Sequence, residues 1–178
     1  VLKIYNTQTR SKQEFVPVEQ GKATIYACGP TVYNFFHVGN ARPFIIFDTL
    51  RRYLEYTGYD VTFVQNFTDV DDKMIEIAKT GDMTLSELGK YYIDAYFEDA
   101  KGLGIREADF HPMATKHIGE IIKLVKKLIE NEHAYEVDGD VYYNVSSFAN
   151  YGKLSGQSLE DLQAGARIDV ADIKRNPE

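Results

Sequence analysis

The chain has 178 residues, of which 44% are hydrophobic and 26% are charged, a balance typical of globular proteins and not of disordered or fibrous ones. Its longest apolar runs, such as residues 43–47, are far shorter than the roughly 20 residues of a membrane span. The net charge is −7, whereas a surface that binds a nucleic-acid backbone is positively charged. A single cysteine, Cys28, excludes an internal disulfide and suits a reducing, cytoplasmic compartment.

A strand, a helix and a second strand are predicted in succession near the beginning. Residues 22–28 form an apolar strand that Gly29-Pro30 ends. Residues 40–56 carry apolar side chains at helical spacing, and residues 60–67 are rich in β-branched and aromatic side chains, as strands are. Shorter strands are expected at residues 2–6 and 14–18, around a polar turn at 7–12.

Strand, helix and strand with short connections imply a parallel sheet, whose ligands bind outside the carboxyl ends of the strands. Residues 28–40 and 68–72 are therefore expected side by side at one rim. Further along, Thr84 and Glu87 form a capping box that opens a helix, and the apolar stripe of residues 118–129 predicts a helix with a buried face. Asp138-Gly139 indicates a hairpin over residues 134–144.

The segment 28–40 is the most informative stretch for chemistry. It places His37, Gly39 and Asn40 at the start of a helix that follows the first parallel strand. A helix N-terminus attracts phosphate, a glycine lets a flat base approach the backbone, and the two side chains can donate hydrogen bonds to charge that develops on a phosphate. The alternative is that His37 and Asn40 only cap the helix.

The run Cys-Gly-Pro-Thr-Val-Tyr-Asn-x-x-His-Val-Gly-Asn-Ala-Arg-Pro, residues 28–43, resembles the signature of cysteinyl-tRNA synthetases. These are the class I enzymes that charge tRNA with cysteine. The match continues through residues 47–54 and 66–73, and near the end through 152–156 and 174–177. The resemblance thus extends over nearly the whole chain.

This resemblance implies an α/β fold, a Rossmann-like parallel sheet with flanking helices. Residues 1–115 would be the first half of the nucleotide-binding catalytic domain, and residues 116–178 the start of a connective insertion. The family's lysine loop, its other zinc ligands and its anticodon-recognition domain do not occur before Glu178. We therefore expect a piece of a longer protein that is inactive by itself.

The resemblance also assigns roles to individual residues. ATP, as a substrate with magnesium, would bind at the start of the helix, and the substrate cysteine would bind beside the strand ends. The implied catalytic residues are His37 and Asn40; those for ATP are Thr31, His37, Gly39 and Asn40; those for cysteine are Cys28, Gly29 and Thr68.

Cys28 has two interpretations. A lone cysteine at a strand end is usually a buried small apolar residue. In the family it is one ligand of a zinc ion that binds the substrate thiolate, and its other ligands would lie outside this chain. Zinc prefers thiolate sulfur to a neutral hydroxyl, so it would separate cysteine from serine, which shape alone does poorly.

Other polar residues carry weaker signals. Asp69, Asp71 and Asp72 suit a first helical turn capped by Thr68, and their spacing is not that of a calcium loop. The remaining histidines have no partners at metal-ligand spacing, so they are interpreted as surface or packing residues: His111, His117 and His133.

The expected function of the full-length protein is to activate cysteine with ATP and transfer it to tRNA(Cys), through regions largely absent here. It would act as a monomer, without a membrane partner. Two alternatives remain open at this point. One is a related ligase of the mycothiol pathway that delivers cysteine to an amino sugar, and the other is a truncated, non-catalytic paralogue that serves as a binding module.

Overall fold

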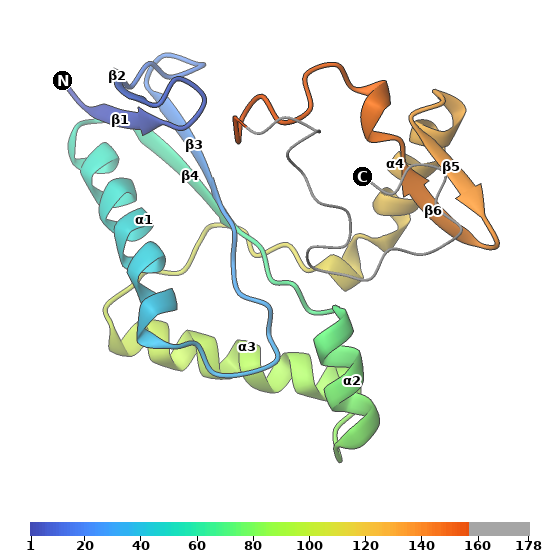
Figure 1. Cartoon of the computed structure of the whole chain (residues 1–178). Helices are drawn as coiled ribbons and strands as arrows, with labels where there is room; N and C mark the ends of the chain where they lie inside the picture. The colour runs from blue at the N-terminus through green and yellow to red at the C-terminus, as the bar shows by residue number, and fades with distance from the viewer. Residues whose placement is uncertain (157–178) are drawn as a thin grey trace. The chain divides into compact units, whose positions relative to one another are not determined.

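The computed structural model describes residues 1–156 and divides into two compact units (Figure 1). One unit is Pro17–Ile118, and the other joins Val1–Val16 to the described part of Gly119–Glu178. Within residues 1–156 no helix has the length and hydropathy to cross a membrane. The sequence motif at residues 174–177 lies outside the described residues.

The predicted parallel unit is present in Pro17–Ile118. Strand β3 (Lys22–Ala27) pairs with β4 (Asp60–Gln65) in parallel, in register from Lys22 opposite Asp60 to Ala27 opposite Gln65. Helix α1 (Val38–Tyr56) connects them and lies along the sheet (Figure 1). Its buried residues recur every three or four positions, which is the helical period that the sequence predicted.

A third extended segment, residues 109–113, lies along the edge of β4 that does not pair with β3, and is called the third ribbon below. The amide of Gln65 donates to the carbonyl of Phe110 at 3.0 Å, and that of Phe67 donates to the carbonyl of Pro112 at 2.8 Å. Two isolated bridges, Val64 with Phe110 and Phe67 with Met113, are both parallel. β4 therefore has a hydrogen-bonded neighbour along both edges, a feature that the sequence did not predict.

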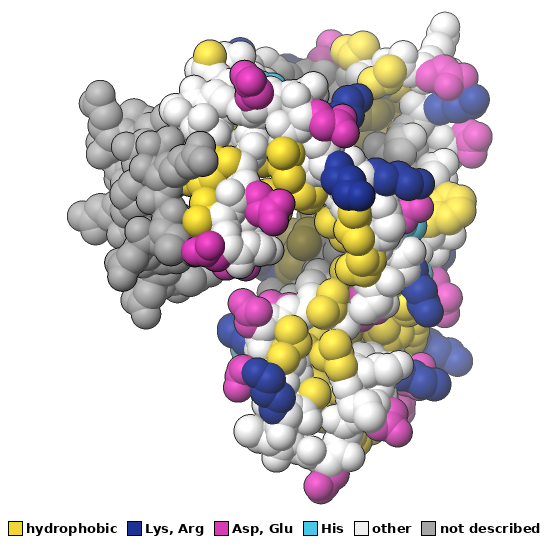
Figure 2. Space-filling model, turned by 90° about the vertical axis from the view of Figure 1, so that its right-hand side faces the viewer, with side chains coloured by type: hydrophobic (Ala, Val, Ile, Leu, Met, Phe, Trp, Pro, Cys, Tyr) yellow, Lys and Arg dark blue, Asp and Glu magenta, His cyan; other side chains and the backbone are white. Residues whose placement is uncertain are grey.

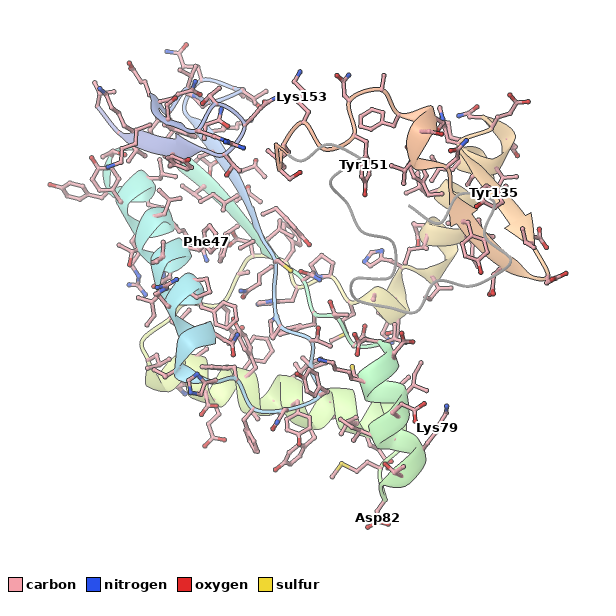
Figure 3. All side chains as sticks on the ribbon, viewed as in Figure 1. Phe47, Lys79, Asp82, Tyr135, Tyr151 and Lys153 are labelled. Carbon is pink, nitrogen blue, oxygen red and sulfur yellow. The ribbon has the colours of Figure 1, made fainter. Side chains whose placement is uncertain are left out.

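Helices α2 (Asp72–Thr80) and α3 (Leu85–Gly102) complete this unit, with Lys79 in the last turn of α2 and Asp82 just after it (Figure 3). The predicted capping box at Thr84 and Glu87 is confirmed, because each side chain accepts from the other residue's backbone amide. The hydrophobic core draws residues from the loop after β3, from the segment just after β4, and from α1, α2 and α3: Val32, Phe44, Phe67, Met74, Leu88, Ile93, Tyr96 and Ala100.

A buried arginine fastens α1 to the segment after α3. Arg51 donates to the carbonyl of Glu107 and to the carboxylate of Asp109, each at 2.7 Å. The other oxygen of Asp109 accepts from the amide of Phe63 at 2.7 Å. Through this carboxylate, α1, β4 and the third ribbon share one network.

In the other unit, the first hairpin differs from the prediction. Strand β1 (Lys3–Asn6) pairs with β2 (Ser11–Glu14), not with residues 14–18. The turn begins after Asn6 as predicted, where the side chain of Asn6 accepts from the amide of Gln8 at 2.9 Å, but it ends at residue 10 and not at residue 12. Pro17 has no amide hydrogen to continue the ladder.

The second hairpin matches its prediction. Strands β5 (Ala134–Val137) and β6 (Asp140–Tyr143) are antiparallel, and the ring of Tyr135 on β5 (Figure 3) stacks on that of Tyr142 at 5.7 Å. Both turn residues, Asp138 and Gly139, have positive φ, as a two-residue turn of this hand requires. Short 3₁₀ turns cover Ala114–Lys116 and Val145–Ser147.

Helix α4 (Ile118–Glu130) forms where predicted, but its stripe is not core, so that expectation was wrong. None of its side chains is fully buried, and Ile121, Ile122 and Leu124 are exposed. Apolar periodicity fixes which face of a helix is apolar, not what covers it. On the molecular face in Figure 2, exposed hydrophobic side chains lie among mixed acidic and basic ones.

Candidate functional site

A pocket of about 530 Å³ lies between the end of β3 and the start of α1, within the size range of small-molecule sites. It brings together most of the residues predicted for the site: Cys28, Gly29, Thr31, His37 and Asn40. The aromatic residues Tyr33, Phe35, Phe36 and Phe44 add apolar walls. Gly39 and Thr68 are not among its lining residues, although each lies next to one in space, as described below.

His37 and Asn40 form a capping box at the start of α1. His37 Nδ1 accepts from the amide of Gly39 at 3.0 Å, and Asn40 Oδ1 accepts from the amide of His37 at 3.2 Å. Each side chain therefore uses an acceptor to cap the helix. A neutral imidazole that accepts at Nδ1 carries its proton on Nε2, so His37 Nε2–H and the Asn40 amide nitrogen remain as donors.

Gly39 takes part in the same box. Its amide is held by His37, so that N–H is already paired at the helix start. A Cβ at position 39 would meet only the His37 ring within 4 Å, with Nδ1 at 3.3 Å. The outer side of Gly39 is thus open for a flat group to approach the backbone.

Gly29 is required by the packing of the rim. A Cβ at this position would lie 1.7 Å from the carbonyl oxygen of Asn66, a distance that no side chain can occupy. The amide of Gly29 donates to Asn66 Oδ1 at 2.9 Å. The turn after β3 and the residue after β4 are therefore in direct contact, as the predicted parallel topology requires.

Thr68 lies at the same rim. The prediction that it caps a helix was wrong. It bridges Thr31 in parallel, its amide donates to the carbonyl of Pro30, and its carbonyl accepts from Val32, both at 3.1 Å. The backbone is still extended at Thr68. The cap of α2 is Asp71, whose carboxylate accepts from the amide of Lys73 at 2.9 Å.

Asp69 has a role that the sequence interpretation missed. Its carboxylate is buried and accepts from both the amide and the hydroxyl of Thr115, so it is not in a first helical turn. The signal that could have found it is the alternation Phe63, Gln65, Phe67, which continues to position 69 on the buried face of the sheet. Asp72 does lie in the first turn of α2, as predicted.

Cys28 is exposed, so its interpretation as a buried apolar residue is wrong. Its thiol lies 3.6 Å from the carbonyl of Gly29. Within residues 1–156 no three side chains from His, Cys, Asp or Glu are grouped as a metal site. A structural zinc ion takes four ligands, so Cys28 and the other described residues do not form a zinc site by themselves.

His111 is a packing residue, as predicted. Its ring stacks on Phe67 with the centroids 4.9 Å apart, and Nδ1 lies 2.9 Å from the carbonyl of Gln65. Burial lowers the pKa of this imidazole, and the hydrogen bond to Gln65 offsets part of that effect. His133 contacts the hydroxyl of Ser147, and His117 is exposed.

Residues 14–178 match the family model described as the tRNA synthetases class I (C) catalytic domain. This chain belongs to that family. Two curated relatives are both named cysteine–tRNA ligase. The one from Clostridioides difficile is 59% identical over 176 residues and the one from Carboxydothermus hydrogenoformans is 56% identical over 176 residues, which is 99% of this chain in each case.

The synthetase chain spans 38% of the length of each of these relatives. Because both are named as tRNA ligases, the amino-sugar alternative is not favoured. Among solved structures, a LeuRS–tRNA–LeuAMS ternary complex from Agrobacterium radiobacter is similar over 68% of this chain and 16% of its own, with a TM-score of 0.57 and 19% identity. That likeness shows that the two chains share a fold over the part that aligns.

Proposed function

We propose that the protein containing this chain is a cysteine–tRNA ligase. The carboxylate of cysteine displaces pyrophosphate from the α-phosphorus of ATP to form cysteinyl-adenylate, and the cysteinyl group then passes from the adenylate to the terminal adenosine of tRNA(Cys), with release of AMP. The observation that carries this proposal is 59% identity across 99% of the chain to a protein of that name. The match includes the rim where the pocket lies.

ATP binds with magnesium at the start of α1, beside Thr31, His37, Gly39 and Asn40. As the substrate carboxylate attacks the α-phosphorus, negative charge builds on the phosphate oxygens. His37 Nε2–H and the Asn40 amide nitrogen are the donors that stabilise this charge. The capping box supports that role, because it holds both side chains by their acceptor atoms and so orients the donors before the substrate arrives.

The substrate cysteine binds beside Cys28, Gly29 and Thr68. Cys28 would be one ligand of a zinc ion whose remaining ligands would come from outside the described residues. When bound, zinc would select a thiolate over the hydroxyl of serine. The exposed position of Cys28 on the pocket wall supports its assignment as a ligand.

Residues 1–115 belong to the first half of the catalytic domain and residues 116–178 to a connective insertion. The complete protein is cytoplasmic and monomeric. The net charge of −7 on this chain is consistent with tRNA binding mainly through other parts of that protein.

Cysteine-dependent exchange of pyrophosphate into ATP by the complete protein tests this proposal. We expect exchange with cysteine and almost none with serine, and then cysteine-dependent charging of tRNA(Cys). Equal exchange with serine, or none with cysteine, contradicts the assignment. Exchange without charging of tRNA, but with transfer to an amine acceptor, contradicts the second step only.

A further inference from the structure

Asn66 is the residue after β4, and its side-chain amide connects both sides of the rim. Oδ1 accepts from the amide of Gly29 at 2.9 Å and from the hydroxyl of Tyr26 at 3.0 Å. Nδ2 donates to Thr68 Oγ1 at 3.4 Å. One side chain thus contacts two of the three residues proposed to bind the substrate cysteine.

The orientation of this amide follows from its partners. Two donors, the Gly29 N–H and the Tyr26 hydroxyl, converge on one atom, which must be the oxygen. The nitrogen therefore faces Thr68. Because Thr68 Oγ1 accepts there, its own hydroxyl hydrogen is left to point elsewhere and can donate to a ligand.

The backbone adds a second constraint at the same place. The absence of space for a Cβ on Gly29 means that the turn holding Cys28 lies directly on the peptide of Asn66. Movement of the Asn66 side chain would release Gly29 and Thr68 together. We propose that Asn66 is a positioning residue that fixes Cys28-Gly29 and the Thr68 hydroxyl relative to each other, and so sets the affinity for the amino-acid substrate.

This inference takes the identity of the substrate from the proposed function, whereas the contacts of Asn66 are independent of that function. Three variants distinguish the hydrogen bonds of the Asn66 side chain from one another. Asn66→Ala removes all three hydrogen bonds, and Asn66→Asp keeps the oxygen for Gly29 but has no donor for Thr68. The matched control is Tyr26→Phe, which removes only the bond from the exposed outer side of the sheet.

The first readout needs no enzyme activity, because Cys28 is the only thiol in the chain. The rate constant for the reaction of Cys28 with an aromatic disulfide is measured as a function of pH in the 178-residue chain. Its plateau at high pH, where the thiol is fully ionised, reports how accessible the thiolate is, independently of the pKa. We expect Asn66→Ala to raise the plateau by about threefold or more, because of the three bonds lost the one to Gly29 holds the turn that carries Cys28. Asn66→Asp and Tyr26→Phe should match the unmodified chain.

The second readout is pyrophosphate exchange by the complete protein. Asn66→Ala should raise the KM for cysteine about tenfold and leave the KM for ATP within about twofold, because ATP contacts other residues. Asn66→Asp should raise the KM for cysteine despite its unchanged thiol plateau. Tyr26→Phe should change neither KM.

An unchanged plateau and an unchanged KM for cysteine in Asn66→Ala would overturn the proposal, as would an equal rise of both KM values. If circular dichroism shows that Asn66→Ala does not fold, Asn66→Asp decides, and an unaltered KM for cysteine in that variant overturns it. If the unmodified protein shows no exchange with cysteine, the proposed function fails, and the thiol rates alone decide the role of Asn66.

Discussion

The α-carbon of Gly29 faces the carbonyl oxygen of Asn66 so closely that a methyl group on it would lie 1.7 Å from that oxygen. Gly29→Ala should therefore lower the free energy of unfolding by at least ~2 kcal/mol, because the two strand ends must move apart. Gly102→Ala is the control, since its Cβ would meet no atom within 4 Å. It should be neutral or stabilising by up to ~1 kcal/mol. Urea unfolding measures both, and equal effects would contradict this packing.

Arg51 should contribute far more stability than an exposed basic residue. Its side chain is 10% exposed and bonds to Asp109 and the carbonyl of Glu107. Arg51→Met leaves these oxygens without their partner, so we expect a loss of roughly 2–4 kcal/mol. Lys79→Met breaks the exposed pair with Glu76 and should cost less than about 1 kcal/mol. Similar losses in the two variants would contradict the larger contribution of Arg51.

Capping and catalysis by His37 can be separated. Asparagine is a good N-cap residue, whereas alanine is not. His37→Asn should therefore keep the stability of α1, and His37→Ala should lose about 1 kcal/mol. In the complete protein both should lower kcat for cysteine activation by on the order of 10²–10³, the effect of one lost oxyanion donor. If only the KM for ATP rises, His37 serves ground-state binding instead.

His111 should make stability depend on pH near neutrality. Burial lowers its pKa in the folded chain, so the unfolded chain binds a proton first as the pH falls. The free energy of unfolding should thus decrease below about pH 6.5 and level off once the folded chain is also protonated. Glu55 and Glu87 have lowered pKa values as well, but the stability they contribute is lost only at more acidic pH.

His111→Gln is the matched variant, because its amide can still donate to the carbonyl of Gln65. Urea unfolding of both chains between about pH 7.5 and 5.5 should show a stability difference that shrinks as the pH falls. A difference that stays constant over this range would place the titration elsewhere.

The isolated chain should hold zinc weakly or not at all. Cys28 supplies one donor where a tetrahedral site needs four. Equilibrium dialysis should give the same low zinc content for the unmodified chain and for Cys28→Ser, and the isolated chain should show almost no exchange activity. One tightly held zinc per chain that Cys28→Ser abolishes would mean that the chain carries the whole site.

Local chemistry explains what the sequence could predict. Asp138-Gly139 accepts positive φ at both positions, so a tight hairpin needs little help from the rest of the fold. The Thr84 capping box depends on residues three apart. The pairing of β3 with β4 follows from hydrophobic strands on either side of one helix. Five of the seven predicted site residues line one pocket because they occupy a single turn and the beginning of that helix.

What the sequence could not predict depends on distant partners. The third ribbon contains Pro112 and lacks the alternation of a strand, so only its bonds to Gln65 and Phe67 reveal it. Asp69 looks like a helix-start residue until Thr115 is placed beside it. The stripe of α4 gave the apolar face correctly and its burial wrongly, because burial depends on neighbours that periodicity does not specify.

The third ribbon is also held to β4 less extensively than β3 is. β3 and β4 pair over six residues in unbroken register, whereas the ribbon meets β4 and the residues after it through isolated bridges. The ribbon can therefore separate from β4 in a local opening that leaves β3 and β4 paired. The amides of Gln65 and Phe67, whose acceptors lie in the ribbon, should then lose their hydrogen-exchange protection in a smaller opening than the amides shared between β3 and β4.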